Sequence, residues 1–392
     1  MIERTPSSSD VIIVGAGITG LSAAVELAER GVRTKLIDAY GPAALASGWT
    51  LAGVRQSGRH PAELPLAKLA VSLWPTLHEK LGAETGYRQH GNLRLARSEA
   101  EIETIRQLVK DQASIGLELS FLDDIKAIRA IAPALSEDVM AASFCPTDGH
   151  ADPLMVAEAY LTRARALGVD ICFGERVTDL VVANGRVTDV VTDKTTHAAG
   201  SVLLATGFLS NPLLAPLGIA LPLRKPIVTV IQTAPCAPTL APVLGVANAD
   251  MAARQELSGR FRVTSGMEDW TGSLIEEEGK ARIRPNVRSI EATIAKVARV
   301  LPMLRDLEIE KIWAGALDLT PDALPVIDFA KGIDNLVIAA GFSGHGFAIG
   351  PVTGPLAAQT LIGREPDLDI SAFRLERFDT MTGAEASLTL HG

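Results

Sequence analysis

The sequence predicts an α/β protein, in which a sheet of mainly parallel strands with covering helices is joined to a discontinuous domain with a mixed α+β sheet. Three observations predict this class. A strand, a glycine turn, a helix and a second strand open the chain; a β-hairpin and another buried strand follow near its middle; an apolar strand, a glycine turn and a helix come near its end. Strands that alternate with helices are typical of parallel sheets. With 392 residues, the chain is long enough for two domains.

The composition is that of a globular protein with a small-molecule partner. Hydrophobic residues make up 47% and charged residues 21% of the chain. The formal net charge of -9 comes without any cluster of Lys and Arg, which argues against a nucleic-acid or anionic-membrane partner. Cys145, Cys172 and Cys236 form no CxxC pair, so we expect reduced core thiols and no metal or iron–sulfur site. No signal peptide or transmembrane segment is visible, so a cytoplasmic location is expected.

The first element is residues 10–39, DVIIVGAGITGLSAAVELAERGVRTKLIDA. A β-branched run predicts a buried parallel strand, and RTKLID predicts a second strand that ends in Asp38. Between them, three glycines have the spacing GxGxxG and open a helix, an arrangement that lets a pyrophosphate approach the backbone and the helix N-terminus. Asp38 is placed to accept hydrogen bonds from an adenosine ribose. The predicted dinucleotide-binding residues are Gly15, Gly17, Ile18, Thr19, Gly20, Asp38 and Ala39.

The middle segments favour FAD over NAD. In an NAD dehydrogenase a second βαβ unit would continue the sheet, whereas here a small-residue loop follows, suited to lie along a pyrophosphate and ribityl chain. GERVTDLVVANGRVTDVVTD predicts a hairpin that turns at Asn184 and Gly185, and AGSVLLATG predicts a buried strand. This order resembles the Rossmann-type FAD-binding domain of the glutathione-reductase type. The further cofactor-binding residues expected are Ser47, Gly48, Thr50, Ala52, Gly53, Val54, Val177, Ala205, Thr206 and Gly207.

The last element is GFSGHGFAIGP, residues 341–351, which follows the apolar strand DNLVIAA. Glycine is useful where φ must be positive or where backbone must approach a ligand. With this turn, the segments VIIVGAGITGLSAA, AGVRQSGRHPAELPLA, YRQHGNLRLA, LLATG and LTPDALPVID resemble the D-amino-acid oxidase, glycine oxidase and sarcosine oxidase family. In that family the turn faces the flavin, where backbone N–H groups stabilise the reduced form. The resemblance therefore implies flavin contacts by Gly341, Gly344, His345, Gly346 and Phe347.

The same resemblance implies how the chain is divided. An FAD-binding domain would comprise residues 1–85, 145–215 and 320–378, and a substrate domain residues 86–144 and 216–319, followed by a tail, 379–392. In the substrate domain, PLRKPIVTVIQTAP, RFRVTSGM and EKIWAGALD read as strands of a mixed sheet above the flavin. NVRSIEATIAKVARVLPML reads as a helix on its outer face.

Arginines are the leading candidates for binding a substrate carboxylate, because a guanidinium group pairs with it bidentately. Arg55 leads, because the corresponding segment in family members borders the reacting face of the flavin; an ordinary phosphate or surface salt bridge is its alternative role. The expected catalytic residues are Arg55, His345 and Arg262, although His345 has a structural role as its alternative. Weaker candidates are Gln56, Arg59, Tyr87 and Arg224, while His60 and His90 are read as packing or surface residues.

The chain departs from single-chain sarcosine oxidases at three places. Ala348 stands where they carry a lysine after GHGF, and WAGALDLTPD lacks the cysteine that would hold FAD covalently, which implies non-covalent FAD. Arg262 aligns with their oxygen-activating lysine, which leaves room for an acceptor other than oxygen.

These departures make the chain similar to flavin subunits of heteromeric amine dehydrogenases, including sarcosine oxidase beta subunits, D-hydroxyproline dehydrogenase, opine oxidase and hydrogen cyanide synthase. The implied reaction is FAD-dependent oxidation of the C–N bond of a secondary amine or N-substituted amino acid, by hydride transfer to flavin N5, to an imine that hydrolyses. A second redox subunit is implied, with room for an FMN at the interface. The alternatives are a self-sufficient glycine or D-amino-acid oxidase that forms hydrogen peroxide, a structural flavin subunit, and a flavin hydroxylase, which the lack of a second GxGxxG disfavours.

Overall fold

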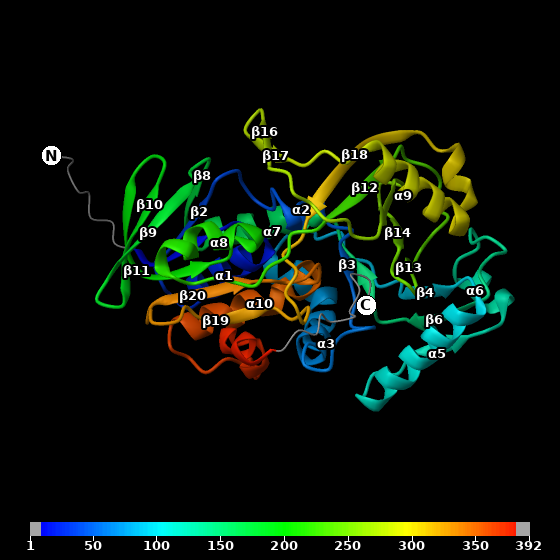
Figure 1. Ribbon diagram of the computed structural model, residues 1–392, viewed down its shortest axis with the longest axis horizontal. Helices are drawn as coiled ribbons and strands as arrows, with labels where there is room; N and C mark the ends of the chain where they lie inside the picture. Colours follow the sequence, from blue (N-terminus) through cyan, green and yellow to red (C-terminus); the bar gives the residue numbers. More distant parts are fainter. Residues whose placement is uncertain (1–8, 382–392) are drawn as a thin grey trace.

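The computed structural model describes residues 9–381 and contains two large sheets that lie side by side along its length (Figure 1). Within these residues the first sheet has eight strands in the order β19-β20-β11-β1-β2-β8, and a hairpin, β9 and β10, extends from β11. The pairs from β20 to β8 are parallel, and β19 is antiparallel. The strands are β1 (Ser9–Val14), β2 (Thr34–Asp38), β8 (Asp170–Phe173), β9 (Val177–Ala183), β10 (Arg186–Thr192), β11 (Thr196–Leu204), β19 (Val326–Phe329) and β20 (Leu336–Ala340).

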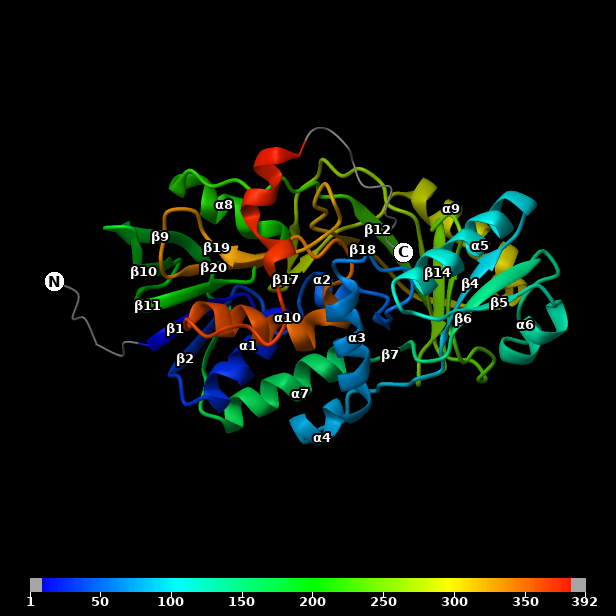
Figure 2. The same ribbon diagram turned by 90° about the horizontal axis from the view of Figure 1, so that it is seen from below.

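Helices cover both faces of this sheet (Figure 2). On one face lie α1 (Ile18–Glu29), α7 (Pro153–Ala166) and α10 (Gly346–Leu361), with α3 (Leu64–Leu73) beside α10; α8 (Ser210–Leu214) lies on the other. Two apolar clusters fill the spaces, because alternate residues of each strand face opposite sides: Ile13 of β1 packs with the first group of helices, and Ile12 packs with α8. The predicted fold class is confirmed.

Helices α1 and α10 approach each other closely. The Ser22 hydroxyl of α1 donates a hydrogen bond of 2.8 Å to the Gly350 carbonyl of α10, and a Cβ added at Gly354 would collide with Ser22 and with the Thr19 carbonyl. Small residues are therefore needed on the facing side of α10. The contact brings the two helix N-termini to the same end of the sheet, so that both add partial positive charge there.

The second sheet also has eight strands within the described residues, in the order β18-β12-β15-β14-β13-β4-β6-β5. Helices α6 (Ile125–Ile131) and α9 (Val287–Val300) cover its outer face, and α5 (Glu99–Ser114) packs beside β4 and β6 (Figure 1). The strands are β4 (Asn92–Ala96), β5 (Ser120–Leu122), β6 (Ala141–Cys145), β12 (Ile227–Thr233), β13 (Val243–Val246), β14 (Met251–Gln255), β15 (Phe261–Ser265) and β18 (Ile309–Ala316).

Two further sheets of two strands each are present within the described residues. Strand β3 (Gly53–Val54) pairs with β7 (Gly149–His150), and β16 (Ile275–Glu277) pairs with β17 (Lys280–Arg282) in a separate hairpin. The remaining elements are short: α2 (Ala46–Trp49), α4 (Leu77–Leu81), η1 (Trp74–Thr76), η2 (Gly207–Leu209), η3 (Ala215–Leu217), η4 (Pro302–Asp306), η5 (Ser371–Phe373) and η6 (Leu375–Thr380). The division of the chain into domains stays a prediction, and most of the expected tail lies outside the described residues.

The three cysteines are free thiols, but only Cys145 is buried. The expectation that all three are core residues was wrong for Cys172 and Cys236. Cys172 lies on β8, an edge strand that has a neighbour on one side only, and Cys236 follows the end of β12. Both are therefore half-buried. Between residues 9 and 381, no helix is long and apolar enough to cross a membrane, and the cytoplasmic location stays a prediction.

Candidate active site

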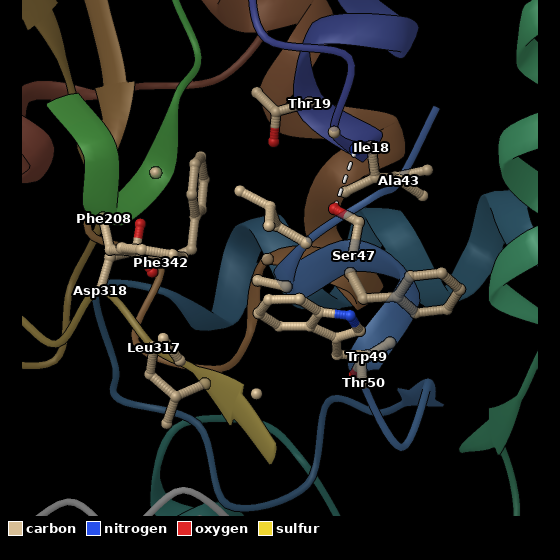
Figure 3. Close-up of a pocket in the computed structure, with 18 of the residues that line it drawn as sticks. Ile18, Thr19, Ala43, Ser47, Trp49, Thr50, Phe208, Leu317, Asp318 and Phe342 are labelled. Carbon is tan, nitrogen blue, oxygen red and sulfur yellow. Dashed lines mark hydrogen bonds between the residues drawn. The ribbon is translucent and has the colours of Figure 1, made fainter. Parts of the chain in front are cut away.

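A cavity of about 550 Å³ lies between the carboxyl ends of the first sheet's strands and the inner face of the second sheet. Such a volume is ordinary for a cofactor or ligand site. In Figure 3, Ile18, Ala43 and Ser47 lie on one side of it, and Phe208 and Asp318 on the other. The carboxyl end of a parallel sheet is where α/β proteins bind their ligands, so the cavity has the expected place.

The turn after β1 can be built only with glycine. Gly15 has a φ of +108°, and a Cβ there would overlap the carbonyl oxygen of Ala205 at the end of β11. A Cβ at Gly20 would overlap the Gly15 carbonyl, so this glycine allows the helix to pack on the turn and does not line the cavity. The Ile18 N–H donates a hydrogen bond of 3.0 Å to the Ser47 hydroxyl, which joins the helix to the following loop (Figure 3).

Asp38 lines the cavity at the end of β2. Its carboxylate accepts hydrogen bonds from the backbone N–H groups of Ala16 at 2.7 Å and of Tyr40 at 2.8 Å. The Gly41 N–H donates a further hydrogen bond of 2.9 Å to Oδ1, the oxygen that Tyr40 also contacts. These bonds fix the carboxylate beside the glycine turn, and Oδ2, which accepts only from Ala16, retains a second lone pair for a ligand hydroxyl.

The sequence reasoning missed Asp318, a fully buried carboxyl group that lines the cavity beside Phe342 (Figure 3). Its Oδ2 accepts a hydrogen bond of 2.7 Å from the Gly341 N–H, and so fixes the carboxy-terminal glycine turn. Burial raises the pKa of Asp318 to about 6, against the opposing effect of the backbone N–H groups of the turn. The signal was present in the quoted segment WAGALDLTPD, in an acid that ends an apolar strand.

The structure does not bring His345 to the cavity wall. Its ring is buried behind the first turn of α10, where Nδ1 lies 2.9 Å from Glu63 Oε2. Because an ionised carboxylate only accepts hydrogen bonds, Nδ1 carries the proton, and Nε2 is buried with no hydrogen-bond partner among the described residues. Burial, with Arg59 nearby, lowers the pKa of His345 to about 4, so the ring is neutral at pH 7.

Arg55 and Arg59 both line the cavity and are both buried. Burial lowers the pKa of Arg55, and the neighbouring guanidinium groups of Arg59 and Arg94 lower it further. Glu63 and Asp148 supply the opposite charge: Arg59 Nη1 lies 3.7 Å from Glu63 Oε2. That atom of Arg59 is buried without a hydrogen-bond partner among residues 9–381, so a guanidinium group that lines the cavity retains an unused donor beside its ion pair with Glu63.

Asp148 holds the loop that carries these arginines. It is fully buried, and its carboxylate accepts hydrogen bonds from the Gln56 N–H at 2.8 Å and from the Ser57 hydroxyl. Beside it, β7 pairs with β3, the strand that precedes Arg55. A segment from the middle of the chain thus fixes the loop that follows the cofactor-binding residues.

Arg262 lies on β15 and is not among the residues that line the cavity. Its Nε lies 2.7 Å from Glu256 Oε1, and its Nη1 donates a hydrogen bond of 2.7 Å to the Thr50 carbonyl. Arg254 lies opposite on β14 and donates to the Leu51 carbonyl. The two arginines tie the second sheet to the cavity loop, which is a positioning role, and the catalytic role expected for Arg262 stays a prediction.

Most residues predicted for the cofactor are brought together by the fold. Those that line the cavity are Gly15, Gly17, Ile18, Thr19, Asp38, Ala39, Ser47, Thr50, Gly53, Val177, Ala205, Thr206, Gly207, Gly344, Gly346 and Phe347. Those that do not are Gly20, Gly48, Ala52, Val54, Gly341 and His345. The sequence reasoning missed a second group that lines it: Tyr40, Trp49, Arg176, Phe208, Val228, Val230, Ala252, Thr264, Asp318 and Phe342.

The cavity has a glycine turn at the carboxyl end of a parallel sheet, a second sheet opposite that turn, and two buried arginines in its wall. This arrangement defines an oxidoreductase that binds a dinucleotide. The chain belongs to the family of FAD dependent oxidoreductases known as DAO, which it matches over residues 10–360. The residues fit FAD, because the cavity runs from the adenosine-type site at Asp38 to the arginines of the loop after β3.

Individual relatives agree with this family. The chain is 28% identical to a D-amino acid dehydrogenase of Allorhizobium ampelinum, over 94% of this chain and 98% of that protein. It is 27% identical to a sarcosine oxidase subunit beta of an Arthrobacter species, over 95% and 92% of the two chains. The crystal structure of L-proline dehydrogenase from P. horikoshii is similar with a TM-score of 0.85 and 26% identity, covering 95% of this chain and 98% of that one. Some longer relatives match over about half of their own length.

Proposed function

We propose that the chain oxidises the C–N bond of a secondary amine or N-substituted amino acid that carries a carboxylate. The observation that carries the proposal is Arg59: it lines the cavity, and its Nη1 is buried without a hydrogen-bond partner among residues 9–381. A buried guanidinium group that faces a ligand cavity is suited to a carboxylate, with which it forms two parallel hydrogen bonds. Arg55, on the same loop, adds a second positive charge.

The chain's own residues supply binding, orientation and electrostatics. FAD, when bound, accepts a hydride equivalent from the carbon that bears the nitrogen. The residues expected to hold it are those of the glycine turn, Asp38, and the first turn of α10, whose N-terminus stabilises negative charge. Asp318 fixes the glycine turn that precedes α10 through its hydrogen bond to Gly341.

The second sheet provides an apolar wall for the rest of the substrate. Val228 and Val230 of β12 and Ala252 of β14 line the cavity, and Gly315 of β18 adds no side chain. These small and apolar residues exclude water and leave space for an N-substituent. An apolar wall that excludes water, together with the positive charge of Arg59, favours a substrate with one carboxylate and an uncharged amine.

We also infer that FAD is held non-covalently and that electrons pass to a second subunit. None of the three cysteines lines the cavity, which supports a dissociable cofactor. The similarity to a sarcosine oxidase subunit beta supports a heteromeric assembly, and an FMN at the subunit contact fits the same proposal. The runner-up is a self-sufficient glycine or D-amino-acid oxidase. The nearly full-length match to a D-amino acid dehydrogenase supports its substrate class but not oxygen as the electron acceptor.

The test is anaerobic reduction of the FAD-loaded chain by a panel of N-methyl amino acids, prolines, opines, glycine and D-amino acids. We expect the visible flavin absorbance to bleach with N-substituted substrates, and reoxidation in air to be slow. Bleaching by glycine or D-amino acids with rapid peroxide formation would select the runner-up. Bound FAD that no amine reduces would leave only a structural flavin subunit.

A further inference from the structure

A hairpin that follows β15 of the second sheet contacts two residues that line the cavity near Asp38. Residues 266–284, here called the strap, leave β15, form the β16–β17 hairpin and return toward α9 (Figure 1). Glu276 lies on this hairpin, and its carboxylate accepts a hydrogen bond of 2.7 Å from the Tyr40 hydroxyl. The two residues are 236 positions apart, so the contact joins separate parts of the chain.

Arg176 completes a triangle with these two residues. It forms an ion pair with Glu276 and donates a hydrogen bond of 3.0 Å to the Tyr40 hydroxyl. Its guanidinium carbon also lies 5.1 Å from the centroid of the Tyr40 ring, a cation–π distance. Tyr40 and Arg176 both line the cavity, one after β2 and the other before β9, whereas Glu276 does not.

The base of the strap is held by apolar contacts. Trp270 and Leu274 pack against the same buried apolar cluster as Leu45, Trp49 and Leu209. Leu45, Trp49 and Leu209 all line the cavity. The strap is therefore anchored beside the cavity by an apolar base and contacts Tyr40 and Arg176 with a polar tip.

We propose that Glu276 is a positioning residue for the bound dinucleotide: it ties the strap to Tyr40 and Arg176, holds these two wall residues in place at the adenosine end of the cavity, and so slows the loss of FAD. This inference rests on the proposed placement of FAD, with its adenosine beside Asp38. Tyr40 is coupled to that site directly, because its N–H donates a hydrogen bond of 2.8 Å to the Asp38 carboxylate. The strap, Tyr40 and the Asp38 carboxylate therefore form one connected set.

The size of the effect follows from exposure. The side chains of Arg176 and Glu276 are 40% and 54% exposed, so their ion pair is partly screened by solvent. A single exposed pair changes an equilibrium by up to about fivefold, and the added tyrosine hydrogen bond extends this. We expect FAD to leave the E276Q variant about three to ten times faster than the wild-type chain.

The experiment compares FAD release from the holoprotein of four chains: wild type, E276Q, Y40F and the control E278Q. Glu278 lies in the turn of the same hairpin, is exposed, and has no ion pair within the described part of the chain, so its substitution makes the same charge change without touching the triangle. Release is followed as the flavin absorbance that stays with the protein at timed intervals after dilution. E276Q and Y40F should lose FAD faster, and E278Q should match the wild type.

A second readout places the effect at the adenosine end. ADP competes with FAD for the apoprotein. The E276Q substitution should weaken the binding of ADP about as much as the binding of FAD, while the binding of riboflavin stays unchanged. Three results would each overturn the proposal. E276Q could release FAD at the wild-type rate, E276Q and E278Q could both release it equally faster, or E276Q could bind FAD more weakly while its binding of ADP is unaltered. No substrate enters these assays, so a failure of the proposed amine oxidation would leave their results unaffected.

Discussion

Glu63 Oε2 and His345 Nδ1 lie 2.9 Å apart, although 282 positions separate the two residues. Glu63 precedes α3, and His345 precedes α10, so the pair joins the loop of Arg59 to the carboxy-terminal glycine turn. Burial alone would raise the pKa of Glu63, but His345 and Arg59 outweigh it and lower the pKa to about 2. An ionised carboxylate with a neutral imidazole therefore orients both cavity segments.

The Glu63–His345 pair predicts that the stability of the fold decreases in acid. The pKa of His345 is lowered from 6.5 to about 4, so its contribution to stability is fully present above pH 6.5 and is lost as pH falls through 4. The loss is on the order of 3 kcal/mol, since a tenfold change in proton affinity corresponds to about 1.4 kcal/mol. Urea unfolding of the apoprotein at pH 7, 5.5 and 4.5 should show a steeper decline for the wild type than for H345Q. Parallel declines would contradict the assignment.

Arg59 should control affinity for the substrate carboxylate. The R59Q variant removes the guanidinium group, so we expect KM for a carboxylate substrate to rise by about 30-fold or more, with FAD binding unchanged. R59K keeps the charge without the planar fork and should recover only part of the affinity. Steady-state kinetics with an amino acid and with its methyl ester separate the effects, since the ester should respond little. An equal rise in KM for the amino acid and for its methyl ester would show that Arg59 does not bind the carboxylate.

Asp148 should be required for the arginine loop. D148N keeps the shape of the side chain but removes a buried charge that accepts hydrogen bonds from Gln56 and Ser57, so we expect about 3 kcal/mol of destabilisation together with a raised KM. The matched variant S57A removes one hydrogen bond and should cost about 1 kcal/mol. Urea unfolding with kinetics checks both. A D148N chain as stable as the wild type would show that the loop is fixed by other contacts.

Gly15 should be indispensable for cofactor binding. G15A forces a positive φ on alanine and places its Cβ against the Ala205 carbonyl, so we expect the FAD content of the purified protein to fall at least about tenfold. Gly31 offers a control, because it has a φ of +77° with no atom within 4 Å of an added Cβ. G31A should cost about 1 kcal/mol and keep its FAD. Similar flavin content in G15A and G31A would argue against a role of the glycine turn after β1 in binding FAD.

The nucleotide end of the cavity could be predicted because its signals are local. Strand, glycine turn, helix and Asp38 lie within about thirty residues of one another, and short-range spacing fixes how they meet. Backbone requirements at Gly15 are also local, since φ and the approach of a neighbouring strand exclude other residues.

The substrate end could not be predicted in the same way. Which side chains of the second sheet face the cavity depends on strand register, and a shift by one residue exchanges the two faces. Arg262 was expected near the flavin, but Glu256 and the Thr50 carbonyl hold it against the cavity loop. Arg254 and Asp318 are likewise defined by partners distant in the chain.

The central claim is that FAD lies in the cavity with its reactive ring beside Arg59 and the N-terminus of α10. The most direct measurement is the visible spectrum of the purified chain, recorded before and after anaerobic addition of an N-methyl amino acid. The account predicts flavin bands at about one FAD per chain, which bleach on addition of the substrate. A colourless protein that takes up no FAD on incubation would contradict it.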